Sequence, residues 1–213
     1  MKITLLATSD THGFIEPTNY VDSGIEKPFG IEKACTTIKK YKQAHPDEKV
    51  ILLDNGDFLE GSPMAYYVAK RADEQDKESF IKAYNQVGYQ LGTIGNHEFD
   101  YGLDYLNFML KHSDRHFICA NIVDNNNEPL LADPYTILDV AGVKIGFLGL
   151  TTTTTKKWKN INDLNDFNLI SEIDACKRYI PEIREKADVV VVVYHGGFER
   201  DHTGNWNDIN PGE

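Results

Sequence analysis

The feature that most constrains the fold of this chain is a regular alternation of short apolar segments with longer amphipathic ones. Each short segment is bounded by polar or turn-forming residues, which is typical of strands. The expected strands are residues 3–7, 50–53, 90–94, 116–119 and 189–194. The last of these, five valines and a tyrosine, is apolar throughout, and we expect it to be covered on both faces.

The segments between the strands show helical spacing of apolar residues. Helices are expected over residues 31–41, 80–87, 103–110 and 173–183. Ser171 is a plausible N-cap of the last helix, and Pro181 within it predicts either a kink or the start of a second short helix. The Gly61-Ser62-Pro63 segment is expected to begin one further helix.

One segment breaks the alternation. Residues 135–140 and 143–148 flank an Ala141-Gly142 dipeptide, a pattern that predicts a β-hairpin. The fold class is therefore α/β with an antiparallel element, rather than a purely doubly wound parallel sheet. A length of 213 residues suits a single domain, 1–213, with a substantial core.

Composition limits the partners. A net charge of −11 argues against binding to a nucleic-acid polymer, and no apolar run approaches the ~18 residues that span a bilayer, so no membrane partner is expected. The apolar start is too short for a signal peptide and is better explained as a first buried strand. The three cysteines, Cys35, Cys119 and Cys176, are expected to be reduced core residues, which favours a cytoplasmic location. Nothing in the sequence indicates the oligomeric state.

Four of the expected strands are each followed by a loop that carries candidate metal ligands. The loops comprise residues 9–13, 55–57, 95–100 and 195–197. In α/β sheets, ligand sites form at the carboxyl ends of the strands. The four loops are therefore expected to lie close together although they are far apart in the sequence.

The residue types in these loops suit a site for two divalent metal ions such as Mn, Zn or Fe. Asp10 and His12 can point at one ion, Asp57 can bridge both, and Asn96 and His195 can serve the second. Two ions held ~3.5–4 Å apart can activate a water molecule and neutralise phosphoryl oxygens. Taken singly, each of these residues could instead be a turn former or a structural residue, so the prediction depends on their occurring together.

These motifs resemble those of the calcineurin-like metallophosphoesterases, in which an Asp-x-His, a Gly-Asp and a Gly-Asn-His-Glu precede a histidine that follows a strand. The resemblance is closer to the 5′-nucleotidase and 2′,3′-cyclic-nucleotide 2′-phosphodiesterase branch, because residues 96–102 read Asn-His-Glu-Phe-Asp-x-Gly and residues 195–201 read His-Gly-Gly-Phe-Glu-Arg-Asp. It covers essentially the whole chain in motif order.

The resemblance implies a fold, an activity and residue roles. The fold would be a four-layer α/β/β/α sandwich of mixed sheets, and the substrates would be 2′,3′-cyclic nucleotides, 3′-nucleotides or 5′-nucleotides. Asp10, His12, Asp57, Asn96 and His195 would be the metal ligands. Two further residues would be catalytic: His97, facing the substrate phosphate, and Asp100, holding His97. Asp100 could also cap a helix, and the neighbouring Glu98 is expected to be a structural hydrogen-bond acceptor rather than a ligand.

The sequence departs from the family pattern after His195. The family has a further Gly-His-x-His motif and a C-terminal nucleotide-binding domain, whereas the only later histidine here is His202. The expected sandwich is therefore incomplete at its C-terminus. Two alternatives stay open: a phosphoesterase for sugar-nucleotides or other phosphomonoesters, and a module that is inactive without the missing ligands.

Overall fold

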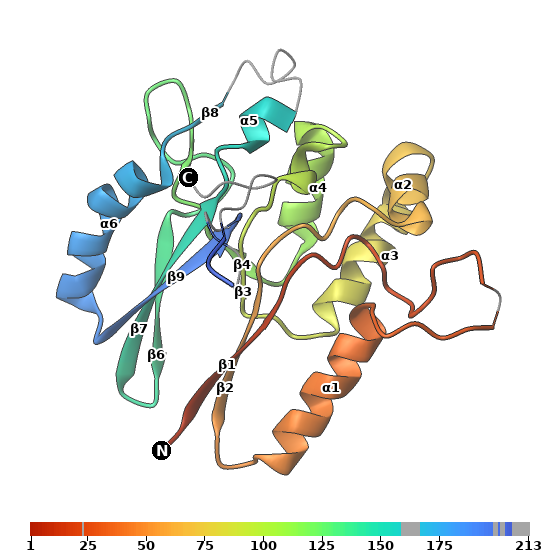
Figure 1. The fold of residues 1–213 in the computed structure, drawn as a ribbon, viewed down its shortest axis with the longest axis horizontal. Coiled ribbons are helices and arrows are strands. Elements are labelled where there is room, and N and C mark those ends of the chain that lie inside the picture. Colours follow the sequence, from red (N-terminus) through yellow and green to blue (C-terminus); the bar gives the residue numbers. More distant parts are fainter. Residues whose placement is uncertain (23, 159–166, 198–199, 201–202, 206–213) are drawn as a thin grey trace. The chain divides into compact units, whose positions relative to one another are not determined.

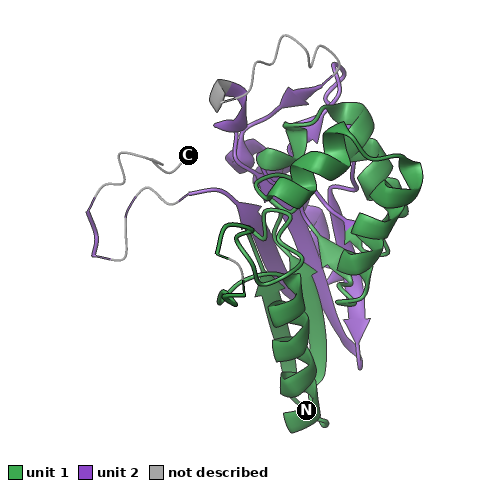
Figure 2. Cartoon of the chain, turned by 90° about the vertical axis from the view of Figure 1, so that its right-hand side faces the viewer, with its two compact units in different colours: residues 1–92, 97–116 green, residues 93–96, 117–213 purple. Residues whose placement is uncertain are grey.

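The computed structural model describes residues 1–22, 24–158, 167–197, 200 and 203–205. The chain forms two compact units (Figure 2). Unit 1 consists of residues 1–92 and 97–116, and unit 2 consists of residues 93–96 and 117–213. Each unit has its own sheet and helices (Figure 1). The mixed α/β class predicted from the sequence is confirmed.

Unit 1 contains a parallel sheet. Strand β1 (Ile3–Thr8) pairs in parallel with β2 (Lys49–Asp54), which pairs in parallel with β3 (Leu91–Gly92). Strand β4 (His116–Phe117) is next to β3 in the sheet order, and unit 1 ends within it. The strands predicted at residues 90–94 and 116–119 are therefore real but shorter than expected.

The helices of unit 1 are α1 (Ile31–Ala44), α2 (Pro63–Lys70), α3 (Glu74–Asn85), the 3-10 helix η1 (His97–Phe99) and α4 (Leu103–His112). Helices α1 and α4 begin at the predicted residues, whereas α3 begins six residues before the predicted start at residue 80 and ends two residues before the predicted end at residue 87. The hydroxyl of Ser62 accepts a hydrogen bond from the backbone N–H of Ala65, so Ser62 is the N-cap of α2, and the helix begins at the Gly61-Ser62-Pro63 segment as expected. The buried side chains that face inward include Leu52, Phe58, Ile81, Tyr84 and Met109.

Unit 2 is built around the predicted hairpin. Strand β6 (Tyr135–Val140) pairs antiparallel with β7 (Val143–Thr151), and β7 pairs in parallel with β9 (Val189–His195). Ala141 and Gly142 both have positive φ values, 55° and 87°, as a two-residue turn with primed geometry requires. The hairpin therefore belongs to a second sheet, as the family resemblance implied.

Helix α6 (Glu172–Lys186) packs on the sheet of unit 2, where Ala175, Tyr179 and Ile183 lie against Leu148 and Leu150 of β7. Ser171 is its N-cap, accepting from the N–H groups of Ile173 and Asp174, and the helix continues through Pro181. The remaining elements are α5 (Thr155–Trp158) and the antiparallel pair β5 (Ile122–Val123) and β8 (Asn168–Leu169).

Two expectations are corrected. Strand β9 is not covered on both faces within the described part of the chain, because Val189 and Val192 are 47% and 43% exposed. The sheet order β6-β7-β9 gives β9 one strand partner there, so it is an edge strand. The three cysteines are free as expected, but only Cys119 is a buried core residue, whereas Cys35 and Cys176 are half-buried. Among the described residues, no helix combines the length and the apolar character needed to cross a bilayer.

Candidate active site

The loops that follow β1 and β2 are tied together by their backbones. The N–H of Asp10 donates to the carbonyl of Gly56 at 3.0 Å, and the N–H of His12 donates to the carbonyl of Asp57 at 2.8 Å. The Asp-x-His and Gly-Asp motifs therefore lie side by side in unit 1, as expected for loops at the ends of neighbouring parallel strands.

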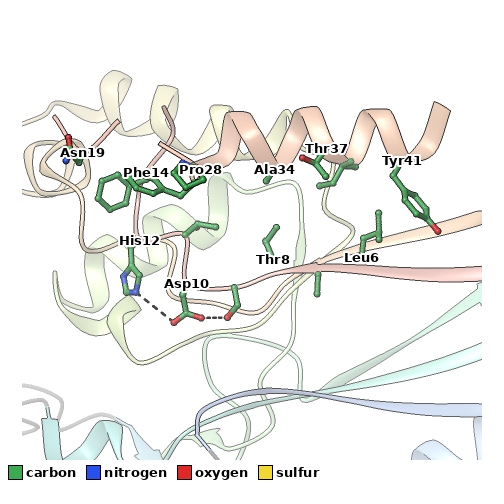
Figure 3. A pocket seen from close by; sticks show the side chains of 16 residues that line it. Leu6, Thr8, Asp10, His12, Phe14, Asn19, Pro28, Ala34, Thr37 and Tyr41 are labelled. Atoms are coloured by element: carbon green, nitrogen blue, oxygen red, sulfur yellow. Dashed lines mark hydrogen bonds and ion pairs between the residues drawn. The ribbon is translucent and has the colours of Figure 1, made fainter. Parts of the chain in front are cut away.

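Asp10, His12 and Asp57 form a group that can hold a metal ion. One ligand atom from each residue lies within 4.8 Å of the ligand atoms of the other two. Nδ1 of His12 lies 2.7 Å from the carbonyl oxygen of Glu60, which leaves Nε2 facing Asp10, whose Oδ1 is 3.9 Å away (Figure 3). An imidazole held through one nitrogen and open at the other is the usual arrangement of a histidine ligand. Carboxylate oxygens and an imidazole nitrogen suit divalent ions of the Mn, Fe or Zn type.

All three residues of this group have left-handed backbone conformations. The φ values are 54° for Asp10, 48° for His12 and 57° for Asp57. Residues other than glycine rarely adopt such values, at a cost of order 1–3 kcal/mol each, and they gather at functional sites. The strained backbone at these three residues is therefore independent support for a functional site in these two loops.

Asp57 is held from two sides. Its backbone N–H donates to Oε2 of Glu98 at 2.8 Å, and its own Oδ1 accepts a hydrogen bond from the backbone N–H of His97 at 2.8 Å. Oε1 of Glu98 also accepts from the N–H groups of Phe58, at 2.7 Å, and Leu59, at 3.3 Å. Glu98 is fully buried, so it is the structural acceptor that the sequence predicted.

His97 is partly exposed and faces two carboxylates. Its Nδ1 lies 2.6 Å from Oδ2 of Asp100 and 3.2 Å from Oε2 of Glu60. Its ring meets that of His12 edge to face, with 5.2 Å between the centroids. The contact between His97 and Asp100 is the one that the family resemblance implied.

Asn96 and His195 lie together in unit 2. Both are buried, and Nε2 of His195 is 3.2 Å from Oδ1 of Asn96 although the two residues are 99 positions apart in the sequence. His195 ends β9, where its carbonyl accepts from the N–H of Thr152 at 2.8 Å. The structure thus brings together the two residues expected to serve the second ion. His202 lies outside the described residues.

A buried ion pair lies under the site in unit 1. The guanidinium of Arg115 contacts the carboxylate of Asp54 at the end of β2, and it lies 4.0 Å from the centre of the Phe58 ring. Asp54 also accepts from the hydroxyl of Thr8 at 3.1 Å, and Thr8 contacts the hydroxyl of Tyr89 at 2.7 Å. The carboxyl ends of β1 and β2 are therefore fixed by a polar network within the core.

A hollow of about 880 Å³ opens beside Asp10 and His12 (Figure 3). It is bounded by β1, by the segment 14–30 and by α1, and its walls are largely apolar, including Leu6, Phe14 and Phe29. The segment 14–30 therefore lines a hollow next to two of the predicted metal ligands.

Two residues of the site were not predicted from the sequence. Glu60 contacts both His12 and His97, and Arg115 neutralises Asp54. Glu60 follows the Gly-Asp motif by three positions, which is the only sequence signal that could have pointed to it. Burial and the nearby carboxylate of Glu60 raise the pKa of Tyr101 to about 12, so its phenol remains protonated beside the site at neutral pH.

The fold and the site define a phosphoesterase class. The sequence matches the calcineurin-like phosphoesterases over residues 3–210, and the chain belongs to that family. The match includes both compact units.

Within the family, the chain is similar to nucleotide-processing proteins. It is 30% identical, over 94% of its length, to a 2′,3′-cyclic-nucleotide 2′-phosphodiesterase/3′-nucleotidase of Salmonella typhimurium, of which it covers 32%. The structure resembles a protein of Staphylococcus aureus assigned as a 5′-nucleotidase, with a TM-score of 0.86 and 33% identity over 97% of this chain and 40% of that one. A calcineurin-like phosphoesterase of Bacillus subtilis gives a TM-score of 0.79 with 29% identity, covering 96% of this chain and 66% of that one. The chain thus spans about a third of the length of the Salmonella relative.

Proposed function

We propose that this chain is the metal-binding part of a phosphoesterase that hydrolyses nucleotides, acting on 2′,3′-cyclic nucleotides, 3′-nucleotides or 5′-nucleotides. The observation that carries the proposal is the group formed by Asp10, His12 and Asp57, whose ligand atoms lie within 4.8 Å of one another. Family membership and the names of the relatives support the choice of phosphoester and nucleotide.

We propose two divalent ions with the ligands that the motifs indicate. Asp10 and His12 would hold one ion, Asp57 would bridge, and Asn96 and His195 would hold the second. Support comes from the Asp10–His12–Asp57 group in unit 1 and from the Asn96–His195 pair in unit 2. When bound, such ions supply an activated water and neutralise the charge that develops on the phosphoryl oxygens.

The residues of the chain supply orientation and a proton. Asp57 is fixed through Glu98 and the N–H of His97, so its carboxylate stays in one place when substrate enters. Because Nδ1 of His97 is held by Asp100, Nε2 is the nitrogen left to face the phosphate. Donation requires the imidazolium form of His97, in which Nδ1–H is held by Asp100 and Nε2 also carries a proton. Transfer of the Nε2 proton to the leaving oxygen would complete the cleavage of the phosphorus–oxygen bond and leave a neutral imidazole protonated on Nδ1.

The experiment is hydrolysis of bis-p-nitrophenyl phosphate with Mn²⁺ titrated in, followed by a panel of nucleotides and sugar-nucleotides. His97→Ala is compared with His112→Ala. His112 is a suitable control because its ring stacks on Phe108 of α4 and its Nδ1 contacts the backbone carbonyl of the same residue. We expect turnover that requires Mn²⁺, falls at least ~100-fold in His97→Ala and is unchanged in His112→Ala. Turnover that is independent of metal, or equal in the two variants, would contradict the proposal.

A further inference from the structure

One residue, Glu60, contacts two imidazoles of unit 1, those of His12 and His97, with different atoms. Its carbonyl oxygen lies 2.7 Å from Nδ1 of His12, and its carboxylate oxygen Oε2 lies 3.2 Å from Nδ1 of His97. His12 comes from the first motif and His97 from the third, so a residue outside all the motifs lies between a predicted metal ligand and a predicted catalytic group.

The loop that carries Glu60 is fixed at both ends. Before Glu60, the N–H groups of Phe58 and Leu59 donate to the carboxylate of Glu98. After it, the hydroxyl of Ser62 donates to the carbonyl of Gly13 at 2.7 Å and caps α2. The backbone on both sides of Glu60 is therefore fixed by hydrogen bonds. These bonds keep the carboxylate of Glu60 within 3.2 Å of Nδ1 of His97.

A neutral imidazole has only one N–H, and two carboxylates face the Nδ1 of His97. Asp100, at 2.6 Å, is the nearer acceptor, and Glu60, at 3.2 Å, is the second. Both favour the tautomer with the proton on Nδ1, because a carboxylate repels a bare ring nitrogen and attracts an N–H. The two acceptors come from different residues, and both favour the same tautomer.

We propose that Glu60 is a positioning residue for His97, acting as a second acceptor for the Nδ1 proton beside Asp100. Its backbone carbonyl orients His12 independently of its side chain. The kinetic part of this inference rests on the proposed function, whereas the part that concerns the tautomer of His97 does not.

The test uses the near-isosteric pair Glu60→Gln and Glu60→Met. Glutamine keeps an oxygen that can accept the Nδ1 proton, and methionine removes it while preserving the length of the side chain. Glu78→Met is the control, because Glu78 lies 3.8 Å from a ring nitrogen of another histidine, His112, on the surface of α3 and α4. Each change is also made in an Asp100→Ala background.

The first readout is the histidine ¹H–¹⁵N spectrum of the 213-residue chain without added metal. We expect a single Nδ1–H signal pattern for His97 in the wild type and in Glu60→Gln, and a mixture of tautomers in Asp100→Ala/Glu60→Met. The inference is overturned if the double variant gives the same pattern as Asp100→Ala alone. Because this measurement needs no turnover, it decides the role of Glu60 even if the phosphoesterase proposal fails.

The second readout is Mn²⁺-dependent hydrolysis together with Mn²⁺ affinity. Glu60→Met should lower kcat by roughly fivefold to tenfold, a fraction of the ~100-fold or more typical of the general acid itself, with Mn²⁺ affinity unchanged because the carbonyl that orients His12 remains. Glu60→Gln should restore kcat to within about twofold of wild type. Equal losses in the Gln and Met variants, or none in either, would contradict positioning by hydrogen bonding.

Discussion

The carboxylate of Glu98 accepts a hydrogen bond from the backbone N–H of Asp57, while Asp57 accepts one from the N–H of His97, the residue before Glu98. The Gly-Asp and Gly-Asn-His-Glu motifs are therefore joined by two hydrogen bonds, one donated from each motif to the other. This relationship gives the glutamate of the third motif a physical role, since it shapes the loop that presents Asp57 in its left-handed conformation.

Replacing Glu98 with Gln tests this relationship. The two carboxylate oxygens of Glu98 accept hydrogen bonds from three backbone N–H groups, whereas a glutamine has only one acceptor oxygen. Its NH₂ group would lie against a backbone N–H, which is also a donor, so at least one buried hydrogen bond is lost. We expect a loss of about 2–3 kcal/mol in the free energy of unfolding, measured by urea denaturation. The exposed variant Glu185→Gln should change it by less than ~0.5 kcal/mol. Equal stability of the two variants would show that Glu98 does not hold the loop.

The side chain of His12 packs directly against the backbone of Gly61. A Cβ at position 61 would lie 2.7 Å from Cβ of His12 and 3.1 Å from its Nδ1, at a φ of 129°. We expect Gly61→Ala to displace His12 and to weaken Mn²⁺ binding at least ~10-fold by calorimetry, since a 1.4 kcal/mol loss already gives that factor.

The matched control is Gly88→Ala. Gly88 also has a positive φ, 79°, but no atom lies within 4 Å of its added Cβ. It should lose about 1 kcal/mol of stability from backbone strain and keep wild-type metal affinity. If both glycine variants bind Mn²⁺ equally well, His12 is not positioned by this contact.

The buried pair of Arg115 and Asp54 should be costly to break from one side. Arg115→Met leaves the Asp54 carboxylate in the core without its cation, and we expect a loss of about 3–5 kcal/mol in a thermal or urea unfolding experiment. Arg184→Met, at an exposed position of α6, serves as the control. A loss below ~1 kcal/mol for Arg115→Met would mean that water reaches Asp54 and that the network does not fix the ends of β1 and β2.

Glu48 gives a pH dependence with a defined sign. Hydrogen bonds from Lys2 and Thr4 lower the pKa of Glu48 from 4.5 to about 2. A carboxyl whose folded pKa is depressed stabilises the fold above its ordinary pKa, and this contribution is lost as pH falls toward 2. The difference in unfolding free energy between wild type and Glu48→Gln should therefore be largest at pH 5 and above and vanish near pH 2. A difference that stays constant across this range would contradict the assignment.

The sequence predicted the elements whose signals are local. Long apolar runs identified β1, β2 and β9, and the Ala141-Gly142 turn identified the hairpin. Strands β5 and β8 were missed because each has two residues and exists only through pairing with a partner distant in the sequence. The exposure of Val189 and Val192 could not be foreseen, because a run of valines looks the same in an edge strand and in a central one.

Most residues of the candidate site could also be proposed from the sequence, but Glu60 and the backbone conformations could not. The motif residues were singled out because ligand types cluster after strands, and the contact of Asp100 with His97 was implied by the family resemblance. Glu60 was missed because an isolated acidic residue in a loop is usually solvated, and only the folded loop turns it toward two imidazoles. The left-handed conformations of Asp10, His12 and Asp57 also depend on tertiary hydrogen bonds that no local pattern records.

The most direct test of the central claim, a metal site built on Asp57, is Mn²⁺ binding measured by titration calorimetry for wild type, Asp57→Asn and Asp104→Asn. Asp57 is buried beside Asp10 and His12, whereas Asp104 is exposed on α4. We predict saturable binding in wild type and Asp104→Asn, and affinity at least ~10-fold weaker in Asp57→Asn, where a negative ligand has become neutral. Equal affinity in all three proteins, or no binding in wild type, would contradict the account.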